Sequence, residues 1–484
     1  MNDINDIFLD IIKEIRPTNE ELLLIDGIVV EIKKIFDKKA KELDINYLTI
    51  EPQGSTGIKQ TQLRNDSDID LFIGLDYNKF KNNYKGLSKN KKKQQIKKDL
   101  LWYCNNWIIK SLKNEENFKN FKLSYAEHPY VQVNYKKENI IIKLDLVLYF
   151  EIELEFIKKN GPITAVDRSP WHGRFIRDNL TIEQKDDVRL LKQFFKACYC
   201  YGDKSPVGRA GFIGYSSELL IYHFKSITEV FKNFNDLVNH PLDYYGRNKD
   251  ELDKIPHFQN EPLKIIDPID KNRNVASAIS LEAYKYCNYQ ISQFLKKPDK
   301  NYFKISKIPE FDPNIFKNIK PNLFIVEFKD KNRNTHYTEL RDKLSSLADY
   351  IKTHAQKEYT HEPKFGKIIT EIYFETKVDE YNIAIFCENH IISKTYKRRG
   401  PPLKDKIHIL KFREKNQTSY EKDGFLWVDT ERKHYRFIDF LEESINNKIP
   451  KNLEVINLSN SDEVKTISGK RTLYVLTTMV LPFV

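Results

Sequence analysis

The stretch GSTGIKQTQLRNDSDIDLFIGL, residues 54–75, decides the fold of the amino-terminal part of the chain. A strand is predicted over 47–50, a turn opens at Gly54 and Ser55, and an apolar strand follows Asp68 and Asp70. Because side chains of a strand alternate between its faces, Asp68 and Asp70 are expected to project from the same side. Two carboxylates at this spacing repel each other, and a divalent cation would relieve the repulsion.

A third carboxylate, Asp145, lies in the apolar run IIIKLDLVL, residues 140–148, where an unpaired charge is costly to bury. Three acidic oxygen donors suit Mg²⁺, which keeps several waters and takes further ligands from phosphates. Backbone amides at Gly54 and the hydroxyl of Ser55 could hold such a phosphate. An Asp-x-Asp pair alone is more often a solvated strand end. The three elements together predict metal-dependent phosphoryl transfer, with Asp68, Asp70 and Asp145 as catalytic metal ligands.

The composition indicates a globular protein of two to four domains, since 484 residues exceed one ordinary core and 40% of them are hydrophobic. The net charge of +11 favours a polyanionic partner, although 69 acidic residues make the surface mixed. The lysine-rich segment 88–98 is interpreted as the solvated face of a helix rather than as a nucleic-acid patch.

Cysteine usage and hydropathy favour a cytoplasmic protein. The five cysteines form no Cys-x-x-Cys pair, which predicts buried, reduced thiols rather than disulfides or a zinc site. No apolar stretch reaches the length of a membrane span, and the acidic amino terminus is unlike a signal peptide. A membrane partner is therefore not expected.

Periodicity predicts helices over 4–15 and 20–42, a small mixed sheet with strands over 121–125, 130–135 and 139–150, and helical structure from 186 to about 224. Strands and helices alternate again from 324 to 387. The predicted fold class is α+β and multidomain. It comprises a catalytic domain over 1–180, a helical central domain over 181–300 and a carboxy-terminal α/β domain over 301–484.

Several different short motifs follow one another along the chain. They are YAEHPYV at 125–131, LDLV at 144–147, AVDRSPWH at 165–172, VRLLK at 188–192, GFIGY at 211–215, DPID at 267–270 and, more weakly, RRGP at 398–401. With residues 54–70, they resemble the archaeal (class I) CCA-adding enzymes. These are tRNA nucleotidyltransferases of the polymerase-beta-like nucleotidyltransferase superfamily. The resemblance covers about residues 20 to 300.

The resemblance implies template-independent addition of C, C and A to the 3′ end of tRNA from CTP and ATP, with two Mg²⁺ ions and possible homodimer formation. It implies that the three carboxylates bind the metals. It assigns nucleotide binding to Gly54, Ser55, Lys59, Ser169, His172, Lys192, Tyr201 and Arg273, and tRNA binding to His128, Arg398 and Arg399. Lys59 stands where the family commonly has arginine, and Ser169 replaces its usual threonine.

Arg273 matches the family's base-reading arginine. Arginine only donates hydrogen bonds, and cytosine and adenine each present a ring-nitrogen acceptor on the pairing edge. Uracil and guanine present a ring N–H there, so they would leave buried donors unpaired. The alternative is that Arg273 simply pairs with Asp267 or Asp270, and both roles are compatible.

Two alternatives to CCA addition stay open. A relative with the same chemistry and another acceptor, such as a poly(A)-type polymerase or an oligoadenylate-synthase-like second-messenger enzyme, shares the first motif. A catalytically inert tRNA-binding module is disfavoured, because it need not keep three mutually repelling carboxylates.

Overall fold

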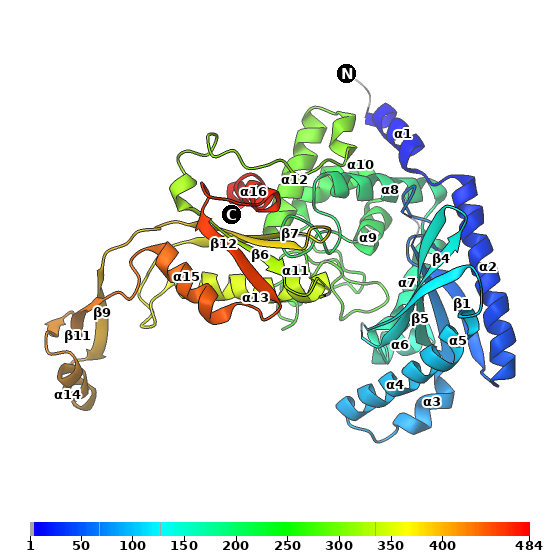
Figure 1. Ribbon diagram of the computed structural model, residues 1–484, viewed down its shortest axis with the longest axis horizontal. Coiled ribbons are helices and arrows are strands. Elements are labelled where there is room, and N and C mark those ends of the chain that lie inside the picture. Colours follow the sequence, from blue (N-terminus) through cyan, green and yellow to red (C-terminus); the bar gives the residue numbers. More distant parts are fainter. Residues whose placement is uncertain (1–3, 67, 126, 334) are drawn as a thin grey trace. The chain divides into compact units, whose positions relative to one another are not determined.

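The computed structural model describes residues 4–66, 68–125, 127–333 and 335–484, and the chain forms two compact units. Unit 1 comprises Met1–Gly202, Phe212–Leu281 and Cys287–Ile305, and unit 2 comprises Asp203–Gly211, Glu282–Tyr286 and Ser306–Val484. The architecture is α+β with several sheets (Figure 1), which confirms the predicted fold class. The three-domain division at residues 180 and 300 stays a prediction.

The centre of unit 1 is a five-stranded mixed sheet in the order β1-β2-β5-β4-β3. Its strands are β1 (Tyr47–Gln53), β2 (Ile69–Asp76), β3 (Phe118–Tyr125), β4 (Pro129–Lys137) and β5 (Ile140–Glu151). Only the β2–β5 pair is parallel among these neighbours, and its register sets Asp70 opposite Asp145. Parallel pairing of β2 and β5 thus brings together two carboxylates that are 75 positions apart in the sequence.

The two faces of this sheet differ because the strand residues alternate. Leu144, Leu146 and Leu148 are buried in the main core of unit 1, together with residues of α2 (Asn19–Glu42) and α4 (Lys89–Tyr103). Asp145 belongs to the opposite set of β5 side chains, so it lies on the other face. One face therefore supplies stability, and the other is available for chemistry.

Asp68 departs from the prediction that it shares a strand face with Asp70. β2 begins only at Ile69, and Asp68 lies exposed before it. The pairing with β1 ends where Gln53 faces Asp70, because Gly54 turns the chain away with φ of +68°. Asp68 therefore has no strand partner on the β1 side. Ser67, quoted with it above, lies outside the described residues.

Helices surround the sheet, and the two predicted at the amino terminus are confirmed as α1 (Ile4–Ile15) and α2. Thr18 begins α2 with a capping box, in which its side chain accepts from the Glu21 amide at 3.2 Å and Glu21 accepts from the Thr18 amide at 2.7 Å. The other α-helices up to residue 296 are α3 (Tyr77–Tyr84), α5 (Ile109–Leu112), α6 (Leu154–Asn160), α7 (Ser169–Asn179), α8 (Ile182–Ala197), α9 (Gly214–Phe224), α10 (Ile227–Asn233), α11 (Lys249–Asp253) and α12 (Leu281–Lys296).

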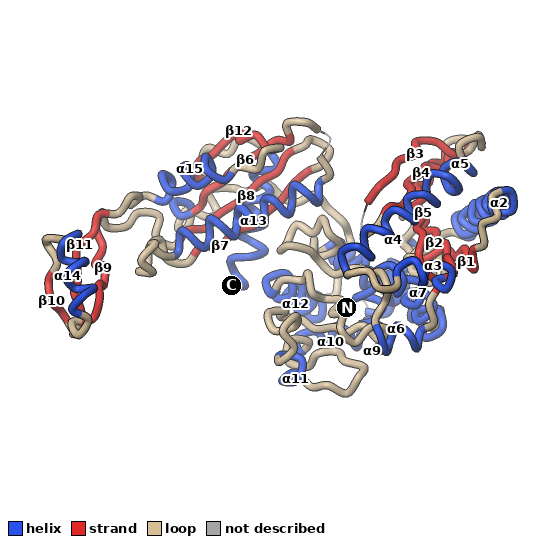
Figure 2. The backbone as a smooth tube through the Cα atoms, turned by 90° about the horizontal axis from the view of Figure 1, so that it is seen from below, coloured by secondary structure: helices blue, strands red, loops and turns tan. Residues whose placement is uncertain are grey.

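Unit 2 contains a four-stranded antiparallel sheet in the order β12-β6-β8-β7. Helices α13 and α15 share a core with it (Figure 2), and α16 contacts β8 and β7. A second sheet, in the order β10-β11-β9, packs with α14 and was not predicted. The elements are β6 (Leu323–Asp330), α13 (Tyr337–Gln356), β7 (Ile368–Glu375), β8 (Glu380–Cys387), β9 (Thr395–Pro402), α14 (Lys406–Lys415), β10 (Tyr420–Lys422), β11 (Phe425–Glu431), α15 (Phe437–Lys448), β12 (Leu453–Asn460) and α16 (Ile467–Tyr474).

Two composition-based expectations have structural counterparts. All five cysteines are buried, and none takes part in a disulfide among the described residues. Among the helices of the described residues, none combines the length and the apolar character that crossing a membrane requires.

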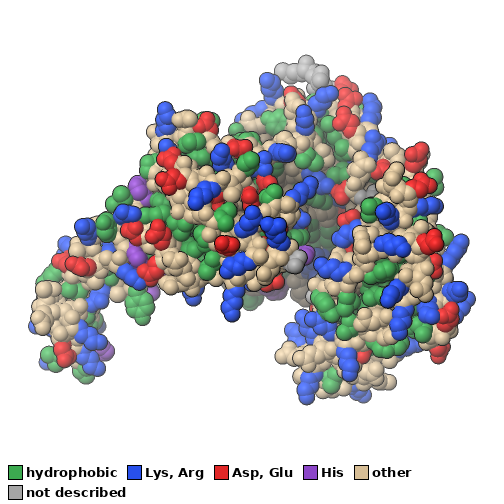
Figure 3. Space-filling model, in the orientation of Figure 1, with side chains coloured by type: hydrophobic (Ala, Val, Ile, Leu, Met, Phe, Trp, Pro, Cys, Tyr) green, Lys and Arg blue, Asp and Glu red, His purple; other side chains and the backbone are tan. Residues whose placement is uncertain are grey.

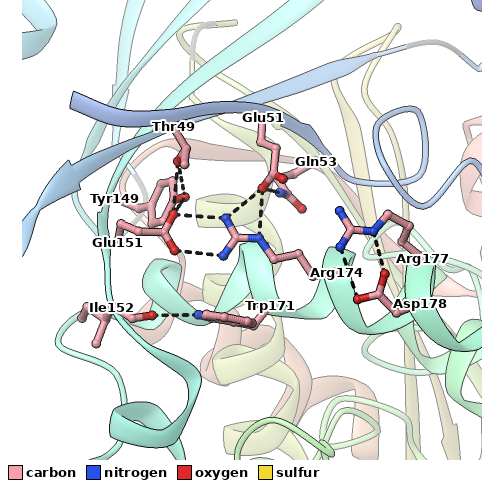
Figure 4. A network of polar contacts seen from close by, with 10 residues as sticks. All are labelled: Thr49, Glu51, Gln53, Tyr149, Glu151, Ile152, Trp171, Arg174, Arg177 and Asp178. Carbon is pink, nitrogen blue, oxygen red and sulfur yellow. Dashed lines mark hydrogen bonds and ion pairs between the residues drawn. The ribbon is translucent and has the colours of Figure 1, made fainter.

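Arg174 attaches α7 to the edge of the sheet (Figure 4). Its guanidinium donates to Glu51 on β1 at 3.0 Å and to Glu151 on β5 at 2.9 Å. Burial raises the pKa of Glu151, but hydrogen bonds from Arg174 and Tyr149 outweigh burial and leave that pKa below its usual value. The network fixes the helix that carries Ser169 and His172.

We expect Arg174→Met to lower the free energy of unfolding by about 2 kcal/mol, because two partly buried carboxylates lose their donor. Arg177→Met on the same helix is the control, since its pair with Asp178 is about half exposed and contributes little. Urea unfolding at pH 7 measures both variants. Equal stabilities for them would contradict the assigned role of Arg174.

Candidate active site

A pocket of about 360 Å³ opens in unit 1 and collects residues that are far apart in the sequence. It holds eight of the fourteen predicted site residues and six that were not predicted. Its lining is Gln53, Gly54, Lys59, Asp70, Phe72, His128, Tyr130, Asp145, Val147, Val166, Ser169, His172, Tyr215 and Arg273.

Asp70 and Asp145 form the acidic wall of the pocket. Burial, together with the charges of Asp145 and Asp68, raises the pKa of Asp70 to about 6. Asp145 is held in place because it accepts a hydrogen bond from Gln132 on β4 at 3.0 Å and lies 3.7 Å from Lys143 Nζ. Burial and the charges of Asp66 and Asp145 also raise the pKa of Asp68, against the opposing charge of Lys143. Besides burial, the negative charge of Asp145 therefore raises the pKa of both Asp68 and Asp70.

The chemistry of this acidic group suits a hard divalent cation. All three donors are carboxylate oxygens, and the cost of charging Asp70 is what a cation would remove. Within the described ranges, no three His, Cys, Asp or Glu side chains converge closely enough to enclose a metal ion. Such a cation would therefore need further ligands from a nucleotide or from water, which is the way Mg²⁺ commonly binds.

Gly54 is required beside this group for two reasons. Its φ of +68° lies in the left-handed region, which side chains with a Cβ atom rarely adopt. A Cβ atom at this position would also lie 2.5 Å from Asp70 Oδ2. The glycine predicted from the sequence therefore allows the backbone to approach the carboxylate directly.

A buried cluster of two lysines and one glutamate lies behind the pocket. Glu218 on α9 accepts from Lys59 Nζ at 2.7 Å and from Thr61 Oγ1 at 2.6 Å, and it lies 3.5 Å from Lys192 Nζ on α8. Lys192 also donates to the Thr61 carbonyl at 2.9 Å. Each of these three charged side chains is at most 10% exposed. Two positive charges thus share one negative charge, and the cluster has an excess positive charge.

The buried excess positive charge destabilises the folded chain. Burial lowers the pKa of Lys192 to about 8, and the nearby Glu218 only partly opposes the effect. The unfolded chain keeps the Lys192 proton up to its ordinary pKa near 10.5, whereas the folded chain releases it near pH 8. Stability from this group is therefore lowest below pH 8 and rises between pH 8 and 10.5. An anion bound beside Lys192 would remove this penalty.

His172, Asp267 and Arg273 form a second buried polar group in the pocket. His172 Nε2 lies 2.8 Å from Asp267 Oδ2, and Arg273 Nη1 donates to the same oxygen at 2.9 Å. Burial lowers the pKa of His172, so the neutral ring donates its Nε2–H to Asp267. Burial raises the pKa of Asp267, but His172 and Arg273 outweigh burial and bring it far below the usual range. Of the two pairings considered for Arg273, that with Asp267 is observed, and Asp270 pairs with Arg168 at 2.9 Å.

The remaining predicted residues lie at different distances from the pocket. Ser169 lines it at the beginning of α7, whereas Ser55 does not line it. Tyr201 lies behind it near Lys192, since a Cβ atom on Gly214 would be 3.4 Å from both Tyr201 Oη and Lys192 Nζ. His128 is buried in the pocket wall, and its Nε2 has no hydrogen-bond partner among the described residues.

Arg398 and Arg399 belong to unit 2, on β9. Arg398 donates to Asn416 at 2.8 Å and lies over the ring of Phe412, and Arg399 is exposed over the ring of Phe425. Their predicted contact with tRNA stays a prediction.

Sequence reasoning gave no role to Glu218 and considered Asp267 only as a pairing partner of Arg273. Glu218 interrupts the apolar run of α9, which is an unusual position for a carboxylate and could have marked it. Its partners Lys59 and Lys192 were predicted as separate nucleotide-binding residues, because the counter-charge that they share is a tertiary contact.

Comparisons with known proteins agree with this site. Residues 186–304 match the family model for the second domain of tRNA nucleotidyltransferase, and residues 366–455 match that for the carboxy-terminal domain of CCA-adding enzyme. A CCA-adding enzyme of Saccharolobus islandicus is 28% identical over 458 residues, covering 94% of this chain and 95% of the relative. That of Methanocaldococcus jannaschii is 27% identical over 493 residues, covering 96% and 97%.

Solved structures with partial similarity include an RNA terminal U-transferase, with a TM-score of 0.44, 11% identity and coverage of 64% of this chain and 100% of that chain. Escherichia coli CdnC in complex with HORMA has a TM-score of 0.42, 14% identity and coverage of 62% and 93%.

The fold, the paired carboxylates and the matched second domain define a nucleotidyltransferase. The chain resembles the archaeal-type CCA-adding enzymes among the tRNA nucleotidyltransferases, and the curated relatives align with it over nearly their whole length at 27% to 28% identity. The resemblance and the prediction of an enzyme are confirmed.

The buried cluster yields a test that separates stability from ligand binding. We expect Lys192→Met to leave the free energy of unfolding at pH 7 unchanged or to raise it by up to about 2 kcal/mol, because Glu218 keeps Lys59 as its partner. Glu218→Gln should lower it by about 3 kcal/mol, because two buried cations then lack a counter-charge. Urea unfolding measures both, with Lys185→Met on the same helix as control.

A loss of several kcal/mol in Lys192→Met would show that this lysine is a structural requirement and would contradict the stored positive charge. The pH profile gives a second check, since the stability increase between pH 8 and 10.5 should vanish in this variant.

Proposed function

We propose that the chain adds C, C and A to the 3′ end of tRNA from CTP and ATP, without a template and with release of pyrophosphate. The observation that carries the proposal is the pocket of unit 1, in which Asp70 and Asp145 share a cavity with Lys59, His172 and Arg273. Acidic and basic groups in one cavity suit a metal-bound triphosphate. The names of the full-length relatives support tRNA as the acceptor.

Asp68, Asp70 and Asp145 would hold the metal, and two Mg²⁺ ions are proposed. When bound, Mg²⁺ supplies positive charge to the attacking hydroxyl and to the leaving pyrophosphate. The chain's contribution is to orient the carboxylates and to give the backbone close access to them. Gln132 orients Asp145, and the glycine at position 54 leaves room for Asp70.

The triphosphate would lie against the side of the pocket that carries Lys59 and, behind it, Lys192, which we call the basic wall. Lys59 lines the pocket, and Lys192 shares the excess positive charge of the buried cluster, so a bound triphosphate would complete its charge balance. His172 uses Nε2–H for Asp267, so its other ring nitrogen donates to a phosphate only when the ring is protonated. The hydroxyls of Ser55, Ser169 and Tyr201 complete the proposed set of donors.

Arg273 would select the base. Its Nη1 donates to Asp267 and also lies 3.3 Å from His172 Nε2, and among the described residues no acceptor is seen for its other nitrogens. The pairing with Asp267 fixes the guanidinium, so the free donors keep a constant orientation. Cytosine and adenine would each satisfy them, whereas uracil and guanine would present another donor. Pairing with Asp267 and base selection are therefore complementary roles.

The transfer step itself is a substitution at phosphorus. The 3′ hydroxyl oxygen of tRNA bonds to the α-phosphorus of the nucleotide, the bond from that phosphorus to the pyrophosphate oxygen breaks, and the hydroxyl proton passes to solvent water. Contacts of tRNA with His128, Arg398 and Arg399, a cytoplasmic location, a homodimer and the three-domain division all belong to the proposal.

Incubation of the purified chain with MgCl₂, tRNA lacking its 3′ CCA and each labelled nucleotide tests the proposal. We expect addition of two C residues and then one A, with no addition of U or G because of Arg273. Arg273→Ala should admit the wrong bases. Sequencing of the product ends measures the outcome.

Extension of poly(A) or other RNA in preference to this tRNA would favour the alternative acceptor. Binding of tRNA with no extension at all would favour the inert binding module. Either result contradicts CCA addition.

A further inference from the structure

Positive charge is concentrated in one short segment of unit 1. Residues 77–98 contain nine lysines and no Asp or Glu, so this segment of 22 residues has a formal charge of +9, whereas the whole chain has +11. The lysines are Lys79, Lys81, Lys85, Lys89, Lys91, Lys92, Lys93, Lys97 and Lys98. We call them the lysine array. The mixed surface inferred from the overall composition is therefore uneven.

The array is unfavourable for the helix that carries it. The first turn of α4 contains no acidic residue, and its amino-terminal cap residue Ser88 makes no side-chain hydrogen bond. Lysines near a helix amino terminus oppose the helix dipole. Lys89, Lys93 and Lys97 are also spaced four residues apart, which brings like charges together on one side. Local stability does not explain this arrangement.

The lysines also have no acidic partners. None of the nine forms an ion pair among the described residues, and all except Lys92 are exposed. The nearest carboxylate in the sequence, Asp99, accepts instead from Tyr84 at 2.8 Å and from Gln95 at 2.7 Å. Lys and Arg side chains gather over the part of the molecule where Figure 1 draws α3 and α4 (Figure 3). The array is thus an uncompensated positive surface.

The array begins beside the pocket and extends away from it. Lys97 Nζ lies 5.6 Å from the ring centre of Tyr125, and Tyr125 pairs with Pro129 next to the pocket residues His128 and Tyr130. The helix then extends from Lys97 back to Lys89, a distance of about 12 Å at 1.5 Å per residue. A strand end that enters the pocket would leave the rest of its chain within reach of these lysines.

The character of α4 decides between possible polyanions. A helix that binds a membrane surface exposes a continuous apolar face, but Ile96 and Leu100 of α4 are buried in the core, and Trp102 is the large apolar side chain that α4 exposes. Exposed lysines suit phosphates as point charges. We propose that the lysine array binds the sugar-phosphate backbone of the double-stranded RNA that follows the 3′ end in the pocket. This inference rests on the proposed function for the identity of the RNA.

The proposal is tested by measuring the affinity for labelled tRNA lacking CCA by fluorescence anisotropy, at NaCl concentrations from 50 to 300 mM. For Lys89→Gln, Lys91→Gln and Lys93→Gln combined, we expect affinity at least about 10-fold weaker and a log–log salt slope flatter by about 2 to 3. The KM for CTP and the kcat at saturating tRNA should stay within about twofold, since no base or triphosphate contact is removed.

The matched control combines Lys34→Gln, Lys38→Gln and Lys41→Gln, three exposed lysines on α2 of the same unit. Its salt slope should equal that of the unmodified chain. The midpoint of thermal unfolding should be equal or higher in the array variant, because the replaced charges oppose the helix; a lower midpoint would assign the lysines to folding.

Equal affinity and slope for the two triple variants would overturn the proposal, as would binding to phosphatidylserine vesicles but not to a 12-base-pair RNA duplex. The outcomes separate the two proposals. Nucleotide addition with an unchanged salt slope refutes only the array. Weakened RNA binding by the array variant, without nucleotide addition by the unmodified chain, refutes only CCA addition.

Discussion

The parallel register of β2 with β5 is the constraint on which the site depends. It sets Asp70 opposite Asp145 on the face of the sheet away from the core, and burial together with the charge of Asp145 then makes the charge of Asp70 costly. The surrounding structure holds the two carboxylates close together and does not neutralise the charge of Asp70. Gln132 orients one carboxylate, and the glycine at 54 lets the backbone approach the other. A divalent cation is the partner proposed for this group.

The basic wall has the opposite imbalance. Lys59 and Lys192 share Glu218, and burial lowers the pKa of Lys192. In a metal-bound triphosphate, the metal would supply positive charge to the acidic wall, and the phosphates would supply negative charge to the cluster of Lys59, Lys192 and Glu218. Relief of the two charge imbalances would then contribute to the free energy of binding. The lysine array is likewise a group of positive charges without acidic partners among the described residues, and it is the proposed contact for the RNA backbone.

Local patterns predicted much of the fold and the acidic wall. Apolar spacing identified α1 and α2, and an acidic residue inside an apolar strand identified Asp145. The polar segment TYKRRGPP has no alternation, so the strand β9 was missed. Asp68 was predicted to lie in a strand because the local sequence allows one, but the strand pairing begins only after it, at Ile69. The role of Glu218 depends on partners more than 150 positions away in the case of Lys59 and Thr61, which no local pattern contains.

Thermal unfolding with and without MgCl₂ and CTP tests most directly whether the acidic wall is a metal and nucleotide site. The account predicts that MgCl₂ with CTP raises the unfolding midpoint of the unmodified chain, because both ligands bind only the folded state. Asp70→Asn should unfold at an equal or higher temperature without ligands, since it removes a costly buried charge, and should lose the increase. The same ligand-dependent increase in Asp70→Asn as in the unmodified chain would contradict the account.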